Sequence, residues 1–140
     1  MRTSSRFTIA VHILLAIAYF DGREKTTSDF LAASAGVNPV VIRRELGKLK
    51  QAGLVTVEAG VGGAALARDP AAITLLDVLD AVEDKQAPLF GFHERPNPAC
   101  PVGGSMHRVL DERLDEARDA LRASLRASTL ADLLAELPPR

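Results

Sequence analysis

Two neighbouring arginines and a lysine near residue 45 are the side chains of this sequence best suited to bind another molecule. Arg43, Arg44 and Lys48 fall on one side of a helix, with Gly47 between them. A guanidinium group can donate two hydrogen bonds to the O6 and N7 atoms of guanine, and a glycine allows close approach. The pattern is typical of a helix that enters the major groove of DNA.

The helix that positions these side chains is expected to span residues 39–51. Asn38 is a preferred N-cap, and Pro39 suits the first helical position because its missing N–H has no partner there. The apolar stripe is Ile42, Leu46 and Leu49, and the opposite face carries Val40, Arg43, Arg44, Gly47 and Lys48. Asn38 has two open roles, contact with DNA or simple capping.

A shorter helix comes first, and the pair predicts a helix-turn-helix. Thr27 or Thr26 is expected to cap this helix, and Thr27 is also a candidate DNA contact. Ala32 and Gly36 are small enough for the close packing and turn that the motif requires.

A β-hairpin is expected directly after the helix-turn-helix, which predicts a winged helix. Residues 54–58 alternate as a short strand, residues 64–67 return, and the tip holds Gly60, Gly62 and Gly63. A phosphate cradle for a nucleotide is disfavoured, because no Lys-Ser/Thr pair and no helix follow the glycines. With no basic side chain at the tip, we expect the wing to contact DNA through backbone N–H groups at Gly62 and Gly63.

Positive charge is concentrated in the amino-terminal part of the chain, although the whole chain carries a net charge of −1. Residues 1–57 hold eight Lys/Arg and four Asp/Glu, a balance of +4, which leaves −5 on the remainder. Such asymmetry suggests orientation on a polyanion, although a merely solvated distribution would look similar. Phosphate contacts, which position a protein without reading sequence, are expected from Arg2, Arg6, Lys48 and Lys50.

Helical patterns also flank this region. One is expected over residues 4–20, another from Thr74, and residues 86–105 form a proline- and glycine-rich loop. A long helix over about 106–128 has an apolar seam with alternating spacings of four and three: Leu110, Leu114, Ala117 and Leu121. We expect this seam to pack on a second copy of the chain, or alternatively on its own domain. The charged residues 108–122 are interpreted as a solvated face with i,i+4 pairs.

Several functional classes are disfavoured by the composition. No apolar run reaches the ~20 residues of a membrane span, and no cleavable leader pattern is present. The single cysteine, Cys100, forms no intrachain disulfide, which fits a cytoplasmic protein. The sequence has no Ser-His-Asp set, no paired carboxylates in a glycine-flanked cleft and no metal-spaced Cys/His cluster, so we do not expect an enzyme.

The order and spacing of several segments resemble the Rrf2 family of winged-helix transcriptional regulators over nearly the whole chain. These segments are residues 1–6, 38–44, 49–55, 62–63 and 73–78. The resemblance implies a dimeric DNA-binding regulator, more often a repressor than an activator, with a sensor loop before the long helix. Relatives often carry an arginine near the wing tip, which is absent here.

Sensor members of that family hold a [2Fe–2S] cluster through three cysteines in this loop. Because such clusters need thiolate-rich ligation, a loop with Cys100 alone predicts no cluster and looks like the single-cysteine, cluster-free branch. Cys100 is then either a thiol switch, helped by nearby His107 or Arg108, or a small packing residue. A small-molecule effector is equally open.

The predicted fold class is mainly α with a small β-hairpin wing, a winged helix-turn-helix plus a long dimerisation helix. The predicted division is 1–84 for the DNA-binding domain, 85–105 for the sensor loop, and 106–140 for the dimerisation and C-terminal helices. The expected partners are double-stranded DNA, a second copy and an oxidant or small-molecule effector, but no membrane. The alternative function is a winged-helix protein-interaction module that does not bind DNA.

Overall fold

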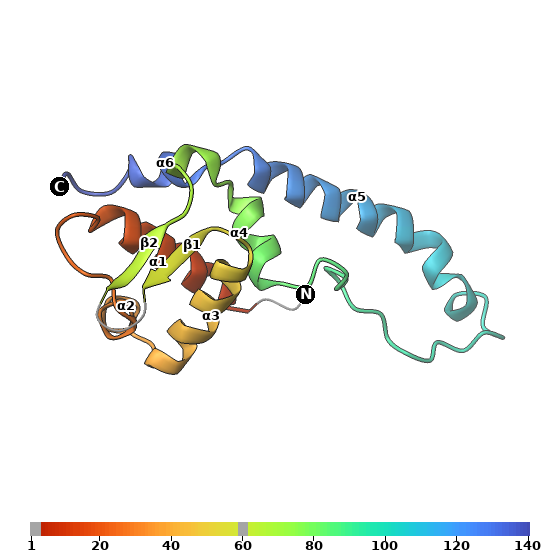
Figure 1. The fold of residues 1–140 in the computed structure, drawn as a ribbon. Coiled ribbons are helices and arrows are strands. Elements are labelled where there is room, and N and C mark those ends of the chain that lie inside the picture. The colour runs from red at the N-terminus through yellow and green to blue at the C-terminus, as the bar shows by residue number, and fades with distance from the viewer. Residues whose placement is uncertain (1–3, 59–61) are drawn as a thin grey trace.

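A computed structural model describes residues 4–58 and 62–140 and confirms the predicted fold class (Figure 1). A helical domain carries a two-stranded antiparallel hairpin, and one long helix projects from it. The elements in chain order are α1 (Arg6–Tyr19), α2 (Ser28–Ala35), α3 (Pro39–Gln51), β1 (Val55–Glu58), β2 (Gly63–Leu66), the 3₁₀ turn η1 (Pro70–Ala72), α4 (Leu75–Val82), the 3₁₀ turn η2 (Gly103–Ser105), α5 (Met106–Arg126) and α6 (Leu130–Leu134).

Side-chain caps fix the starts of α2 and α3 where the sequence places them. The Asn38 Oδ1 accepts a hydrogen bond of 2.9 Å from the Val40 N–H at the start of α3. Thr27 caps α2, with 3.2 Å between its hydroxyl oxygen and the Phe30 nitrogen. Thr26 is instead buried, and its hydroxyl donates to the Ala64 carbonyl at 2.8 Å. Thr26 therefore joins the chain to the hairpin, and the next residue, Thr27, caps α2.

The core lies where α1, α3 and α4 meet, and α3 presents its predicted stripe to it. Ile42 and Leu49 are fully buried and Leu46 is nearly so. The buried side chains of α4 are Leu76, Val78 and Val82, whereas Leu75 and Leu79 are half-buried. α4 contacts α1 and α3 on one side and α5 on another, so a single stripe does not describe its covered surface.

The hairpin is held against the start of α2. Val55 pairs with Leu66 and Glu58 with Gly63 in its register. Gly63 has a φ of 76°, and a Cβ there would lie 3.1 Å from the backbone nitrogen of Thr26. Only glycine suits this approach, because L residues rarely adopt such a φ. The predicted tip residue Gly60 lies outside the described residues.

The long helix α5 is attached to the domain near its carboxyl end, and the loop from α4 runs out to its other end (Figure 1). Arg122 makes two hydrogen bonds to the Asp80 carboxylate, of 2.9 and 3.0 Å, which raise the pKa of the guanidinium further. The interpretation of residues 108–122 as a solvated face is therefore wrong for Arg122, which binds Asp80 of α4. Leu130 of α6 is fully buried against the winged-helix core. α6 therefore packs on the DNA-binding domain, although the predicted division assigns it to the segment 106–140.

Among the described residues, no helix combines the length and apolar character that a membrane crossing requires.

Candidate nucleic-acid interface

The solvent-facing side of α3 carries the predicted reading residues. Arg43, Arg44, Gly47 and Lys50 are exposed, and Lys48 is half-buried. Val40 is 63% exposed at the amino-terminal end of the helix. An exposed aliphatic side chain beside arginines suits the major groove, because thymine presents a methyl group there and guanine presents two acceptors.

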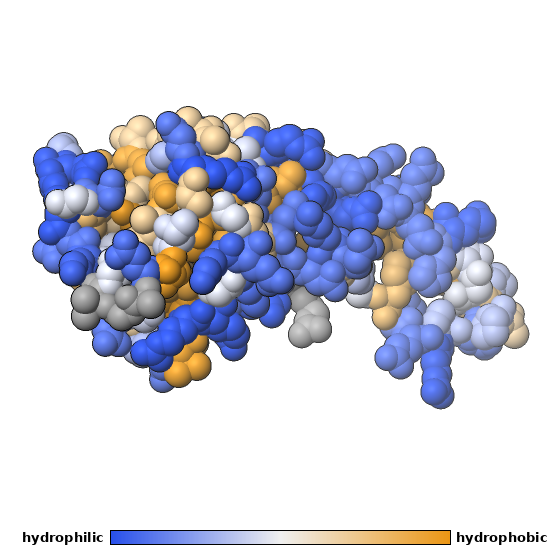
Figure 2. Space-filling view, in the orientation of Figure 1, coloured by the Kyte–Doolittle hydropathy of each residue, from blue (hydrophilic) through white to orange (hydrophobic). Residues whose placement is uncertain are grey.

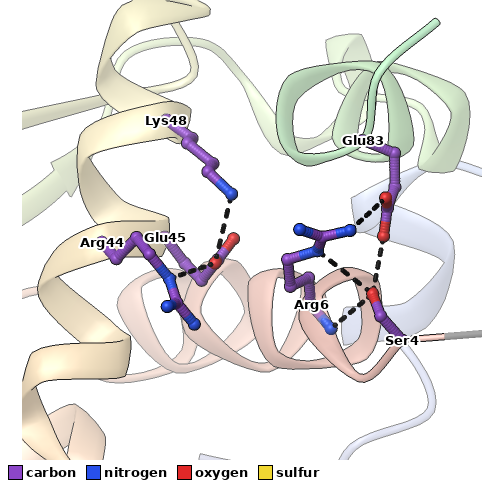
Figure 3. A network of polar contacts seen from close by, with 6 residues as sticks. All are labelled: Ser4, Arg6, Arg44, Glu45, Lys48 and Glu83. Atoms are coloured by element: carbon purple, nitrogen blue, oxygen red, sulfur yellow. Dashed lines mark hydrogen bonds and ion pairs between the residues drawn. The ribbon is translucent and has the colours of Figure 1, made fainter. Parts of the chain in front are cut away.

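One residue of α3 that the sequence interpretation missed lies under this face. Glu45 is fully buried, and its Oε1 lies 3.3 Å from the Arg44 Nε and 3.5 Å from the Lys48 Nζ (Figure 3). Its Oε2 has no hydrogen-bond partner in the described part of the chain. The helical spacing was a usable signal, because Glu45 lies three residues after Ile42 and four before Leu49, on the apolar stripe.

The other predicted phosphate contacts have different surroundings. The Arg6 Nη2 lies 2.8 Å from the Glu83 Oε2, and its Nε donates to the Ser4 hydroxyl (Figure 3). Glu83 follows the end of α4, so Arg6 is partly neutralised by its own domain. Arg2 lies outside the described residues. Asn38 and Thr27 both serve as caps.

The wing offers little positive charge close to its described tip. Glu58 is exposed at the end of β1, and a Cβ on Gly62 would overlap its side chain. Val57 is 40% exposed on the same strand. The glycines at 62 and 63 keep the backbone accessible, whereas a carboxylate beside them disfavours phosphate. Between α3 and the described part of the hairpin, the cationic side chains therefore all lie on α3.

The apolar seam of α5 stays uncovered in the single chain. No residue of α5 is buried, Leu110 and Leu114 are half-buried, and Leu121 is 38% exposed. Figure 2 shows a mainly hydrophilic surface over the viewed face of α5, with hydrophobic residues along its lower edge. The seam is thus available to a partner outside the chain.

The sequence profile of the Rrf2 family, described as iron-dependent transcriptional regulators, matches residues 3–136. The chain belongs to the Rrf2 family. It is 50% identical over 109 residues to YwnA of Bacillus subtilis (strain 168), a candidate HTH-type transcriptional regulator, covering 78% of this chain and 79% of YwnA. It is therefore a DNA-binding transcriptional regulator and not an enzyme.

Solved structures support the same fold. The crystal structure of a candidate DNA-binding protein has 40% sequence identity and a TM-score of 0.74, covering 93% of this chain and 99% of that one. IscR of T. potens superposes with a TM-score of 0.72 at 21% identity, covering 100% and 94% of the two chains. CymR, the global cysteine regulator of B. subtilis, superposes with a TM-score of 0.71 at 22% identity, with 99% of both chains covered. The last two likenesses concern the fold alone.

The loop of this Rrf2 regulator before α5 places its cysteine among backbone N–H groups. Cys100 is half-buried, and hydrogen bonds from the backbone of Gly103, and then of Val102, lower the pKa of its thiol below the ordinary value. The loop is tight here, because a Cβ on Gly103 would lie 2.5 Å from the Asn97 carbonyl oxygen. Backbone donors that favour the thiolate make the sulfur more reactive.

The residues around Cys100 do not fit an iron–sulfur cluster. The chain has one cysteine, and the described residues contain no group of three or more His, Cys, Asp or Glu placed to hold a metal. The His107 ring stacks on Phe92 with 4.1 Å between centroids, and its Nδ1 lies 3.0 Å from the Asp111 Oδ1. The described residues therefore do not offer the thiolate-rich donor set that such a cluster requires.

A cavity of about 550 Å³ lies between α1 and the carboxyl-terminal tail, within the usual size range of small-molecule sites. Its lining is mainly apolar and includes Val11, Leu15, Leu137 and Pro138. His12 contributes a polar atom, with its Nε2 2.8 Å from the Ser34 hydroxyl oxygen. The cavity is a candidate effector site on elements other than the Cys100 loop.

Gly47 allows a test that separates packing from DNA contact. Replacing Gly47 by alanine is expected to raise the free energy of unfolding by about 0.5–1 kcal/mol, because glycine is unfavourable within a helix. An added Cβ would meet no atom within 4 Å. If α3 approaches DNA closely at this point, the variant is more stable but binds operator more weakly. Denaturant titration and fluorescence anisotropy measure the two effects, and unchanged binding would exclude close approach at Gly47.

Proposed function

We propose that this regulator is a homodimer that binds a palindromic operator with one α3 from each subunit and represses transcription there. The observation that carries the proposal is the exposed face of α3, with Arg43 and Arg44 beside the open position at Gly47. An arginine that pairs with guanine contributes roughly 1–3 kcal/mol of discrimination. Lys48 and Lys50 near the end of the helix supply phosphate contacts, which orient it without reading sequence.

The exposed seam of α5 supports the homodimer. A helix of 21 residues spans about 31 Å, and an apolar edge of that length left in water is unfavourable. A second copy would cover it through the same seam. Two-fold symmetry then sets two half-sites about one helical turn of DNA apart.

The proposal is tested by selection from a random pool of duplex DNA of about 30 base pairs, long enough for two half-sites. The expected result is an enriched inverted repeat that binds a dimer, with an affinity that falls as salt rises by about 0.9 logarithmic units per phosphate contacted. Recovery of no preferred sequence would favour the protein-interaction module instead. An enriched site bound by one subunit would contradict the dimer.

We also propose that Cys100 makes the regulator responsive to oxidants, and that it works without an iron–sulfur cluster. The lowered pKa of the thiol supports this, because the thiolate is the form that attacks peroxide. An S–O bond forms as the O–O bond of the peroxide breaks, giving a sulfenic acid and hydroxide. The sulfur loses two electrons and the peroxide gains them.

The reactivity of Cys100 has a definite pH dependence. Because the folded pKa is lowered, the alkylation rate with iodoacetamide should rise through its midpoint at a lower pH than in the urea-unfolded chain. Replacing Gly103 by alanine should return the midpoint toward the unfolded value, because the new Cβ would displace the loop. Equal midpoints in folded and unfolded protein would contradict the structural basis. Cys100→Ser that still loses operator binding on peroxide treatment would exclude Cys100 as the sensor.

A further inference from the structure

A fully buried carboxylate in the DNA-reading helix needs an explanation, because stability does not supply one. Glu45 has no exposed surface, one of its oxygens is unpartnered within the described chain, and its two cationic neighbours lie at 3.3 and 3.5 Å. Replacing a buried carboxylate by an apolar side chain of similar size need not destabilise the fold when its cationic partners reach water, as Arg44 and Lys48 do. Glu45 is therefore better explained by what it does to its neighbours.

The contact with Arg44 uses one particular part of the guanidinium group. The Nε, which lies closest to the side-chain stem, is the atom held by the Glu45 Oε1. The two terminal nitrogens of Arg44 make no hydrogen bond among the described residues, and 57% of the side chain is exposed. These nitrogens form the outer fork, which can pair with guanine O6 and N7.

Arg43 differs from Arg44 in this respect. It is exposed, and the structure gives it no ion pair within the described part of the chain. A free arginine must lose rotational freedom when it pairs with a base, whereas a held one has lost part of that freedom already. Arg44 is thus pre-organised by a carboxylate that DNA cannot reach, and Arg43 is not.

We infer that Glu45 is a positioning residue for sequence reading, and that it makes Arg44 the arginine that discriminates guanine. The inference rests on the proposed function, since it assigns a role within the α3 contact with DNA. Lys48, whose Nζ lies beside the same Glu45 oxygen, keeps an ammonium that suits a phosphate. Figure 3 shows Arg44, Glu45 and Lys48 along one helix.

The test uses the full-length chain and the DNA pool selected with the wild-type protein. Affinities are measured for the enriched sequence, for each single-base-pair change in it, and for a scrambled sequence. The variants are Glu45→Leu, Glu45→Gln and Arg44→Ala, with Arg43→Ala and Lys48→Ala as matched controls. Gln keeps the hydrogen-bond acceptor without the charge, whereas Leu removes both.

Glu45→Leu is expected to fold with an unchanged or raised melting temperature. It should lose about tenfold of the preference for one guanine per half-site, and Arg44→Ala should lose the same preference. Glu45→Gln should lie between Leu and wild type. Combining Glu45→Leu with Arg44→Ala should cost no more than Arg44→Ala alone, because both act through one contact. Binding to scrambled DNA should change little in the Glu45 variants, whereas Lys48→Ala should weaken binding to all sequences and reduce the salt slope by about one.

Three results would overturn the inference while leaving the proposed function intact. One is a Glu45→Leu protein that keeps the wild-type preference at every base pair. Another is an additive loss in the double variant, and the third is loss of the same guanine preference in Arg43→Ala but not in Arg44→Ala. A wild-type protein that enriches no sequence would remove the proposed function, and with it this role for Glu45. If Glu45→Leu does not fold, the Glu45→Gln measurement decides.

Discussion

Replacing both Arg43 and Arg44 by alanine should abolish sequence-specific DNA binding. The two guanidinium groups are the exposed paired donors of α3, and their loss removes the direct reading of guanine in each half-site. We expect affinity for the operator to fall by about a thousandfold or more, to the level of binding to unrelated DNA. Fluorescence anisotropy with operator and scrambled duplexes measures the change.

The matched control replaces Lys85 and Arg95 by alanine, which removes the same charge from exposed positions of the loop after α4. If the loss of affinity comes from weaker long-range attraction between the protein and DNA, both variants will weaken binding alike. If it comes from lost contacts with the bases, only the variant of α3 will weaken binding. Arg44→Ala also removes one of the two cations near the buried Glu45. A modest fall in melting temperature is therefore expected, and circular dichroism should still report a folded helical protein.

Replacing Leu114 and Leu121 by glutamate should separate the subunits of the proposed homodimer. Each carboxylate would sit in the apolar seam, where its desolvation is costly. α5 has no buried residue within the single chain, so the winged-helix domain should stay folded. Light scattering coupled to size exclusion should report half of the wild-type mass. Operator affinity should fall by about 10²–10⁴, the usual gain from two linked binding sites.

Ala123→Glu is the control for the seam, because it places a carboxylate on an exposed position at the opposite side of α5. This variant should keep the wild-type mass and affinity. A protein that remains dimeric after both leucines are replaced would show that another surface joins the subunits.

Much of the fold follows from local signals in the sequence. Asn38-Pro39 and the spacing of Ile42, Leu46 and Leu49 determine the start and the buried side of α3, and the structure agrees with both. The caps at Thr27 and Thr74 act over three residues, so they too can be recognised without knowing the fold. The hairpin follows from alternation and glycines within one short segment.

Pairs that join distant segments could not be predicted in this way. Arg6 and Glu83 are 77 residues apart, and Arg122 and Asp80 are 42 residues apart. Each residue alone resembles an ordinary exposed charge, and the pairing depends on how the helices pack. Glu45 is a different case, because its position on the apolar stripe was visible while its charge suggested a surface. Its burial is therefore the clearest conflict between a residue's charge and its position in the fold, and such conflicts often mark function.

The attachment of α5 near one end has a mechanical consequence. The hydrogen bonds between Arg122 and Asp80 act as a fulcrum, while Cys100 lies before the opposite end of the helix. A tilt of only about 5° at the fulcrum displaces Met106, about 24 Å away along the helix, by about 2 Å. A force applied at the distal end of α5 acts through a longer arm than the contact between α5 and α4. A modest force there therefore produces a larger one at α4, which also contacts α3.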